Sequence, residues 1–518
     1  MRNAKTNLLR MLKIAFKKAL DKNNVASPGK PDASRRKFLQ NSMVAVAALA
    51  ANKAIANSNY VTRFAAKEQP YKIGILGAGV AGLHAAYILQ QANIETTIYE
   101  ASGRTGGRMY TVKNMLGQGI TTELGGEFVD SNHEDILKLA AEFGLGLVDT
   151  DLDKNLVKQI FYFEGKKYKA DDLVIALVPF AVSIKADIDS LPDSISYTNF
   201  GEADKWDKMS IAVYLNLKGI SGWLNKMLNV AFTTEYGLDT DEQSAINFLW
   251  LFDPEHVDKD LFGESDERYK IKGGNQLVVD ELAKRLDNIK TNHAVTKIKS
   301  NGAGFTVSFS NSVTANFDYL ICTIPFSVLR NITLEIDGMT EVKKKCIAEL
   351  GYGRNAKMFA GFKTRYWRRQ GATGQFFSDM PLQLGWDNSQ LQKGTAGGYT
   401  FFTGGYMSDK MIDAPVPDKV KEYITQLEKL FPGATKNYNG KKGIFFWPNH
   451  VHTLGSYACY KPGQWTSIAG VEIEPVGNLL FAGEHCSAAF QGFMNGGAET
   501  GRRAAEQLLV LLKNKIKM

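Results

Sequence analysis

The chain has 518 residues and a formal net charge of +8, and this length is sufficient for two or three domains with sizeable cores. Residues 1–56 carry 12 of the 62 Lys and Arg residues but only 2 of the 54 Asp and Glu residues, so the positive excess belongs to this segment. The remainder is nearly neutral, which argues against nucleic-acid binding. The four cysteines form no C-x-x-C pair, so the sequence predicts neither a zinc site nor a disulfide framework.

The first 56 residues have the features of an export leader. Residues 34–39 read SRRKFL, which matches the twin-arginine signal; residues 43–51 are alanine-rich and weakly apolar, and residues 54–56 form an Ala-x-Ala cleavage site. The apolar stretch is too short to span a membrane. We therefore expect recognition by the twin-arginine export machinery, cleavage near Asn57, a periplasmic or secreted protein and no stable membrane insertion. Residues 7–20 have the pattern of a basic amphipathic helix, to which the sequence assigns no function.

A strand, a glycine turn, a helix and a second strand follow one another between residue 71 and Glu100. The apolar runs are residues 72–76 and 96–99, the turn at 77–82 reads GAGVAG, and the helical pattern covers 83–91. This order is the dinucleotide-binding fingerprint. Gly77 allows the tight turn, Gly79 lets the backbone approach a pyrophosphate, and Gly82 lets helix and strand pack closely. The helix N-terminus offers free N–H groups to phosphates, and Glu100 is placed to accept hydrogen bonds from ribose hydroxyls.

A second glycine pair follows within ten residues of Glu100. Residues 104–108 read RTGGR, in which Arg104 and Arg108 bracket a turn whose backbone N–H groups are exposed. The arginine fork suits a pyrophosphate. Residues 121–130 then read as a strand and another glycine turn.

The middle of the chain alternates between two patterns. Residues 133–267 are mainly helical and aromatic in pattern. A glycine turn at 272–277 opens a helix to residue 286, and strands are expected at 292–298, 305–309 and 319–325. Further on, we expect a strand from about 356, a helix over 420–430 and a strand over 444–447. Residues 477–485 form a buried strand that ends in Glu484, and residues 492–498 open a terminal helix.

The string G-x-G-x-x-G followed by E-A-x-x-R-x-G-G-R resembles the FAD site of the flavin amine oxidase superfamily, which includes monoamine, polyamine and L-amino acid oxidases. The resemblance covers roughly residues 70–515. It implies an α/β, two-domain fold of the monoamine oxidase type, in which a dinucleotide-binding FAD domain is interleaved with a substrate domain. The expected FAD domain comprises residues 70–128, 268–330 and 450–518, the expected substrate domain comprises 129–267 and 331–449, and residues 1–56 form the signal peptide.

The resemblance also implies FAD as cofactor. Val295 matches the residue that meets the adenine, and Glu484 matches an acid near the ribityl and phosphate region. The matching cofactor-binding residues are Gly77, Gly79, Ala81, Gly82, Glu100, Arg104, Gly107, Arg108, Gly125, Gly126, Val295, Glu484, Phe493 and Met494. Some family members attach their flavin through a cysteine, but that position falls near Gly455 and not at Cys459. We therefore expect noncovalent FAD.

The resemblance assigns the chemistry to few residues. It implies transfer of a hydride equivalent from the carbon next to an amine nitrogen to the flavin, hydrolysis of the imine to aldehyde and ammonia, and reduction of O2 to H2O2. Lys357 matches the lysine that holds a water near flavin N5, whereas Tyr457 and Phe493 match two aromatic residues that sandwich the substrate amine.

The substrate is less well determined by the sequence. Phe128 stands where amino acid oxidases carry a carboxylate-binding arginine, and Asp130 matches an acidic position of polyamine oxidases. We therefore expect an oxidase of small-molecule amines, with L-amino acid oxidase as the alternative. A flavin desaturase or isomerase and a non-catalytic flavoprotein are further alternatives. A homodimer is compatible with this interpretation.

Overall fold

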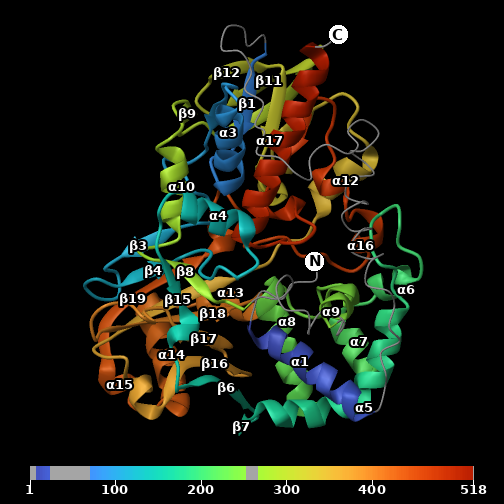
Figure 1. Cartoon of the computed structure of the whole chain (residues 1–518). Helices are drawn as coiled ribbons and strands as arrows, with labels where there is room; N and C mark the ends of the chain where they lie inside the picture. Colours follow the sequence, from blue (N-terminus) through green and yellow to red (C-terminus); the bar gives the residue numbers. More distant parts are fainter. Residues whose placement is uncertain (1–6, 24–70, 253–265, 517–518) are drawn as a thin grey trace.

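The computed structural model describes residues 7–23, 71–252 and 266–516. Figure 1 shows a domain built on a small sheet at the top, a larger sheet at the lower left and a group of helices at the lower right. The twin-arginine motif, the alanine-rich stretch and the Ala-x-Ala site lie outside the described residues. Within the described ranges, no helix combines the length and the hydropathy needed to cross a membrane.

A five-stranded parallel sheet forms the centre of the upper domain. In spatial order its strands are β20 (Leu479–Phe481), β13 (Tyr319–Cys322), β1 (Ile73–Leu76), β2 (Thr97–Tyr99) and β9 (Ile289–Lys290). All four pairings are parallel, so the carboxyl ends of these strands meet at one edge. The residues of β1 and β13 are buried throughout, as expected for parallel strands covered on both faces. The sheet thus unites segments that are about 400 residues apart in sequence.

Two helices pack closely against each other in this domain. They are α3 (Val80–Gln91), which follows the first glycine turn, and α17 (Met494–Ile516) near the C-terminus (Figure 1). A Cβ added to Gly497 would lie 2.8 Å from the Val80 side chain, and one added to Gly501 would lie 2.2 Å from the Ala81 carbonyl oxygen. Only glycine fits there, and the close packing brings the N-termini of both helices to the same edge of the sheet.

Smaller elements complete the upper domain. A four-stranded sheet has the order β12 (Thr314–Phe317), β11 (Gly304–Phe309), β10 (Val295–Asn301) and β14 (Thr333–Glu335). Two two-stranded sheets pair β3 (Thr111–Lys113) with β4 (Thr121–Glu123), and β5 (Leu147–Asp149) with β8 (Tyr269–Ile271). Helices α4 (Glu134–Glu142), α10 (Gln276–Ala283), α11 (Phe326–Leu329) and α12 (Glu341–Glu349) surround them.

The larger sheet has seven strands and carries the other wall of the site. Its order is β19 (Tyr438–Phe446), β15 (Ala356–Phe362), β18 (Gly397–Thr403), β17 (Leu384–Asp387), β16 (Ala372–Ser378), β6 (Val157–Phe163) and β7 (Lys166–Tyr168). Helix α14 (Val416–Leu430) packs against β15 and β19. The expectation that residues 133–267 are mainly helical is confirmed, since helices α4 to α9 make up most of their regular structure, and β6 and β7 of this segment supply one edge of the sheet.

Helices make up the rest of the lower part. They are α5 (Ala170–Asp189), α6 (Ala203–Asp207), α7 (Ile211–Leu217), α8 (Gly222–Tyr236) and α9 (Ala245–Leu251). Helix α1 (Asn7–Lys22), expected from its amphipathic pattern, lies across α5 (Figure 1). The side chains of α1, α5, α7, α8 and α9 belong to one hydrophobic cluster.

Candidate active site

A cavity of about 570 Å³ lies where the carboxyl ends of the parallel strands face the seven-stranded sheet. Its lining includes the turns that follow β1, β2, β13 and β20, together with side chains of β15, β17 and β18. Every site residue expected from the sequence lines this cavity except Gly82. Gly82 lies behind the first turn, where an added Cβ would come within 2.0 Å of the Gly77 carbonyl oxygen. The expected residues are therefore brought together, and Gly82 has a packing role.

The first glycine turn presents backbone to the cavity. Gly77 has a φ of +106°, which favours glycine, and α3 begins directly after Gly79 without a side-chain cap. A Cβ added to Gly79 would meet no atom within 4 Å, so open space lies in front of it. The N-terminal N–H groups of α3 are thus available to an anion, as a pyrophosphate requires.

Glu100 ties the end of β2 to this turn. Its Oε2 accepts a hydrogen bond from the backbone N–H of Ala78 at 2.8 Å, and its Oε1 accepts from both the N–H and the hydroxyl of Ser102 at 2.8 Å. These bonds fix a carboxylate on the cavity wall, in the position expected for binding a ribose.

Two arginines, Arg104 and Arg108, bind the second glycine turn and the segments around Ser456 and Glu484. The guanidinium of Arg104 donates to the Gly107 carbonyl at 2.6 Å and lies 3.9 Å from the centre of the Tyr110 ring. Arg108 donates to Glu484 at 2.7 Å and to the Ser456 carbonyl at 2.8 Å. Glu484 also accepts from the N–H of Gly492 at 2.8 Å. The Arg108–Glu484 ion pair therefore joins the second glycine turn to the turn that follows β20, 376 residues further along the chain.

Lys357 is the centre of a buried charge cluster. Its ammonium donates to the carbonyls of Glu123 at 3.2 Å and Gly125 at 2.9 Å, and to Oε2 of Glu127 at 2.9 Å. An ammonium has three N–H donors, so these three acceptors use all of them. In this arrangement Lys357 fixes the backbone of the Gly125 turn, and a water held by Lys357 would replace one of the three acceptors.

Glu127 completes the cluster. Its Oε1 accepts from the Lys270 ammonium at 2.8 Å and from the Trp386 indole N–H at 2.8 Å, while Oε2 faces Lys357. Burial disfavours the charged form, but the ammonium groups of Lys270 and Lys357 outweigh burial and lower the pKa of Glu127 to about 2. Lys270, Lys357 and Glu127 together carry one net positive charge, which ionisation of the nearby Glu123 would balance.

The pKa of Glu123, four residues earlier, is shifted in the opposite direction from that of Glu127. Burial raises its pKa to about 7, although the backbone N–H of Asn275 and the Thr111 hydroxyl each donate a hydrogen bond to it at 2.8 Å. Its titration therefore falls in the neutral range, close to Lys357.

Aromatic side chains form the wall around this cluster. The Tyr457 hydroxyl donates to the Thr234 carbonyl at 3.2 Å, and burial raises its pKa, which keeps the phenol neutral. Phe493 contacts the edge of the His133 ring at 4.9 Å between ring centres. The ring centre of Trp386 lies 5.8 Å from the ring centres of both Phe128 and Phe402. The wall is therefore largely apolar.

Phe128 and Asp130 both lie beside charged or ionisable side chains in the cavity wall. The Lys270 ammonium lies over the Phe128 ring, 4.6 Å from its centre, so this apolar side chain contacts a cation. Asp130 is only 2% exposed, and its carboxylate accepts from the Glu267 N–H at 2.9 Å and lies 3.2 Å from His133. Asp130 is thus part of the inner wall and not of a solvent-exposed entrance.

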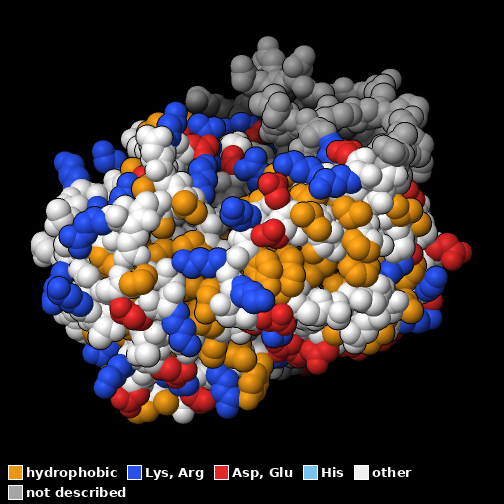
Figure 2. All heavy atoms as spheres, turned by 90° about the horizontal axis from the view of Figure 1, so that it is seen from below, with side chains coloured by type: hydrophobic (Ala, Val, Ile, Leu, Met, Phe, Trp, Pro, Cys, Tyr) orange, Lys and Arg blue, Asp and Glu red, His pale blue; other side chains and the backbone are white. Residues whose placement is uncertain are grey.

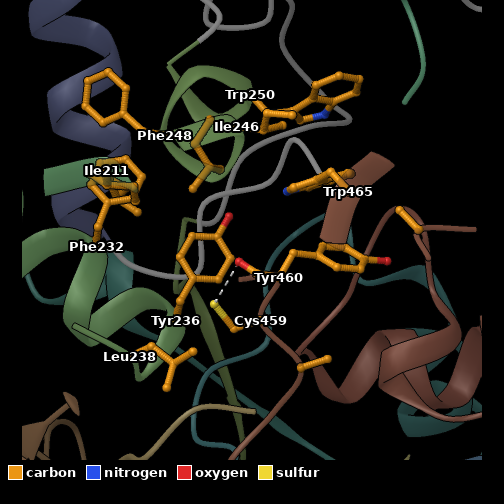
Figure 3. Packing of buried hydrophobic residues seen from close by; sticks show 14 of the residues in the cluster. Ile211, Phe232, Tyr236, Leu238, Ile246, Phe248, Trp250, Cys459, Tyr460 and Trp465 are labelled. Atoms are coloured by element: carbon orange, nitrogen blue, oxygen red, sulfur yellow. Dashed lines mark hydrogen bonds between the residues drawn. The ribbon is translucent and has the colours of Figure 1, made fainter. Parts of the chain in front are cut away.

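Cys459 lies away from the cavity. Its thiol is fully buried in a hydrophobic cluster beside Tyr236 and Tyr460 (Figure 3), and it does not line the cavity. Gly455 has neither a thiol nor space for one, since an added Cβ would lie 2.8 Å from Tyr352. Among the described residues, no cysteine lines the cavity to which FAD could be linked.

Several lining residues were not predicted. They include Glu127, Thr234, Asn355, Leu384, Trp386 and Phe402. Lys270, which does not line the cavity, donates to Glu127. The position of Glu127 between two glycines and Phe128 gives a hint in the sequence, but its partners are 143 and 230 residues away.

The parallel sheet, the two glycine turns and the open backbone at Gly79 define a dinucleotide-binding domain. The donor set fits FAD: Glu100 would hold the ribose, and the N-terminus of α3 and the turn that precedes Arg108 would hold the phosphates. Residues 80–509 match the model of a family described as flavin containing amine oxidoreductase. The chain belongs to this family, its cofactor is FAD, and its reaction class is the oxidation of amines.

Individual relatives are distant but cover nearly the whole length. An amine oxidase [flavin-containing] of Danio rerio is 25% identical over 466 residues, which cover 85% of this chain and 86% of the relative. A putative L-amino-acid oxidase of Bacillus subtilis is also 25% identical and covers 86% and 95% of the two chains. Among solved structures, cyclohexylamine oxidase from Brevibacterium oxydans has a TM-score of 0.76 at 21% identity, covering 86% of this chain and 99% of that one. Putrescine oxidase bound to putrescine has a TM-score of 0.72 at 20% identity, with coverage of 85% and 99%.

Proposed function

We propose that the protein oxidises a simple amine in preference to the parent amino acid. The observation that carries this proposal is the set of cations at the cavity. Among the described residues, the Lys and Arg side chains that line it are Arg104, Arg108 and Lys357. Arg104 and Arg108 belong to the phosphate end, and all three donors of Lys357 are used. An amino acid carboxylate would therefore find no free N–H donor on these three side chains, so leaving water would cost several kcal/mol that the positive charge of the cluster offsets only in part.

The charge cluster suits the neutral form of an amine. The net positive charge of Lys357, Lys270 and Glu127 disfavours a protonated amine beside it, and an unprotonated amine is the form that can be oxidised. Tyr457, Phe493 and Trp386 would enclose this neutral group and exclude water. Asp130 adds a negative charge farther along the wall, where it favours the approach of a cationic amine.

Bound FAD supplies the two-electron oxidation, and O2 is the expected electron acceptor, giving H2O2. In this proposal Lys357 keeps the Gly125 turn and the Glu127 carboxylate in position and can exchange one acceptor for a water. The FAD is held without a covalent bond, because Cys459 lies outside the cavity.

The L-amino acid oxidase alternative has two supports. One is the likeness to the putative L-amino-acid oxidase of Bacillus subtilis. The other is Lys270, whose ammonium is 4.6 Å from the Phe128 ring and could reach a carboxylate if Phe128 and Glu127 moved.

We also propose export through the twin-arginine pathway, on the SRRKFL motif of residues 34–39. A homodimer is supported by hydrophobic side chains exposed on the lower face of the molecule (Figure 2). Ile175 and Val182 of α5 are 61% and 49% exposed, and Val213 and Leu217 of α7 are 53% and 63% exposed. The oligomeric state in solution, from light scattering, tests this assembly.

Oxygen uptake with matched substrates tests the amine preference. We expect kcat/KM for tyramine to exceed that for L-tyrosine by at least about tenfold, and the same for cadaverine over L-lysine, a ratio that needs about 1.4 kcal/mol. If the amino acid is the better substrate in both pairs, the amine proposal is wrong and Lys270 becomes the candidate carboxylate partner.

A further inference from the structure

The N-terminal helix α1 is built into the substrate domain, although it lies before the expected cleavage site. Seven of its hydrophobic side chains are at most 4% exposed, namely Leu8, Leu9, Leu12, Ala15, Phe16, Ala19 and Leu20, and Lys13 is buried as well, at 1%. They recur at intervals of three and four residues and so form one face of the helix. This degree of burial is typical of a helix in a hydrophobic core and not of a leader peptide that does not pack against the folded protein.

The groove that receives α1 is apolar and specific in shape. Helix α5 contributes Leu173, Val174, Leu177, Ala181, Ile184 and Ile188, which are all buried in the same cluster. The Phe16 ring lies 5.2 Å from the ring of Phe252, which itself stacks on Phe248 of α9 at 4.5 Å. At the end of α1, the Asn23 side chain donates to the Val178 carbonyl of α5 at 2.9 Å.

The same group of helices leads to the cavity. Helix α8 shares the hydrophobic cluster with α1, and Thr234 near the C-terminal end of α8 lines the cavity and accepts the hydrogen bond of Tyr457. If α1 were removed, the apolar side of α5 would be exposed to water and α8 would lose part of its support. The cavity wall at Thr234 would then be less firmly placed.

We propose that α1 is a permanent part of the working protein: residues 7–22 stay in the groove between α5, α8 and Phe252, and cleavage after Ala56 leaves them bound as a separate peptide. Before cleavage, the segment with the twin-arginine motif connects two parts of one folded unit, since α1 ends at Lys22 and β1 begins at Ile73. This inference does not depend on the substrate proposed above.

A cleavable version of the full chain tests the proposal. A protease site placed after Ala56 would allow the complete, FAD-loaded protein to be cut after folding, followed by size exclusion and mass spectrometry. We expect the peptide 1–56 to elute with the rest of the chain. Its release as a free peptide from the otherwise folded, FAD-containing protein would overturn the proposal.

Two point variants of the same chain provide a matched comparison. Phe16→Asp places a charge in the groove, whereas Lys18→Asp changes an exposed residue of the same helix. We expect Phe16→Asp to lower Tm by roughly 5 °C and to release the peptide after cutting, and Lys18→Asp to do neither. Equal Tm values and equal peptide retention in the two variants would contradict the proposal, whatever the activity.

Discussion

Replacing Lys357 by Met tests the charge cluster most sharply. The substitution removes three hydrogen bonds and leaves the carbonyls of Glu123 and Gly125 without this donor. It also leaves the buried Glu127 with Lys270 as its remaining ammonium partner. Loss of a buried ion pair costs about 3–5 kcal/mol, and an orphaned carbonyl costs about 1 kcal/mol or more. We therefore expect a destabilisation of about 4 kcal/mol after partial relaxation, and turnover about 100-fold slower with FAD still bound.

Lys363→Met is the matched control, because Lys363 is exposed and directly follows the same strand. Glu127→Gln and Lys357→Met each remove the same Glu127–Lys357 ion pair, so the double variant should be more stable than the sum of the single effects by about 2 kcal/mol. Urea unfolding followed by tryptophan and flavin fluorescence measures stability, and stopped-flow reoxidation measures the reaction with O2. If Lys357→Met unfolds and turns over like Lys363→Met, the account of the cluster is wrong.

The remaining predictions concern pH, cofactor and export. Burial raises the pKa of Glu123 from 4.5 to about 7, so its contribution to stability, roughly 3 kcal/mol, is complete below pH 4.5 and is lost as the pH rises through 7. Glu123→Gln should therefore raise Tm relative to wild type at pH 8 more than at pH 5, and an equal difference at both pH values would contradict this. Arg108→Ala breaks the contacts with Glu484 and the Ser456 carbonyl and should weaken FAD retention roughly 10-fold or more in flavin titrations; unchanged affinity would remove Arg108 from the site. Acid precipitation should release FAD into the supernatant, and flavin left on a peptide would disprove noncovalent binding. Replacing Arg35 and Arg36 by Lys should retain the protein in the cytoplasm in cell fractionation, and unchanged export would exclude the twin-arginine route.

Much of the upper domain can be predicted because its signals are local. The strand, turn and helix of residues 73–91 and the strand that ends before Glu100 are marked by short apolar runs and glycines, and the structure places them within a few residues of the expected bounds. Gly77 and Gly82 are required by a positive φ and by close packing, which the sequence pattern already implies. The amphipathic pattern of α1 is local as well.

The larger sheet, the charge cluster and the docking of α1 could not be predicted, because they depend on contacts between segments that are distant in the sequence. The strands β6 and β16 pair in parallel although they are about 200 residues apart, and a short apolar run cannot be distinguished from a buried helix by periodicity alone. The position of Lys357 is visible in the sequence, but Glu127 and Lys270 become its neighbours only when β15 and β8 meet the Gly125 turn. The docking of α1 on α5 is likewise a tertiary contact that no local pattern shows.

The proposed preference for an amine rests on the cavity wall, where, among the described residues, the lining Lys and Arg side chains leave no free donor for a carboxylate. Anaerobic mixing of the purified full chain with cadaverine or with L-lysine tests it directly, because bleaching of the flavin absorbance reports oxidation without any step involving O2. We predict that cadaverine bleaches the flavin at least about tenfold faster at equal, subsaturating concentration. Faster bleaching by L-lysine would contradict the account.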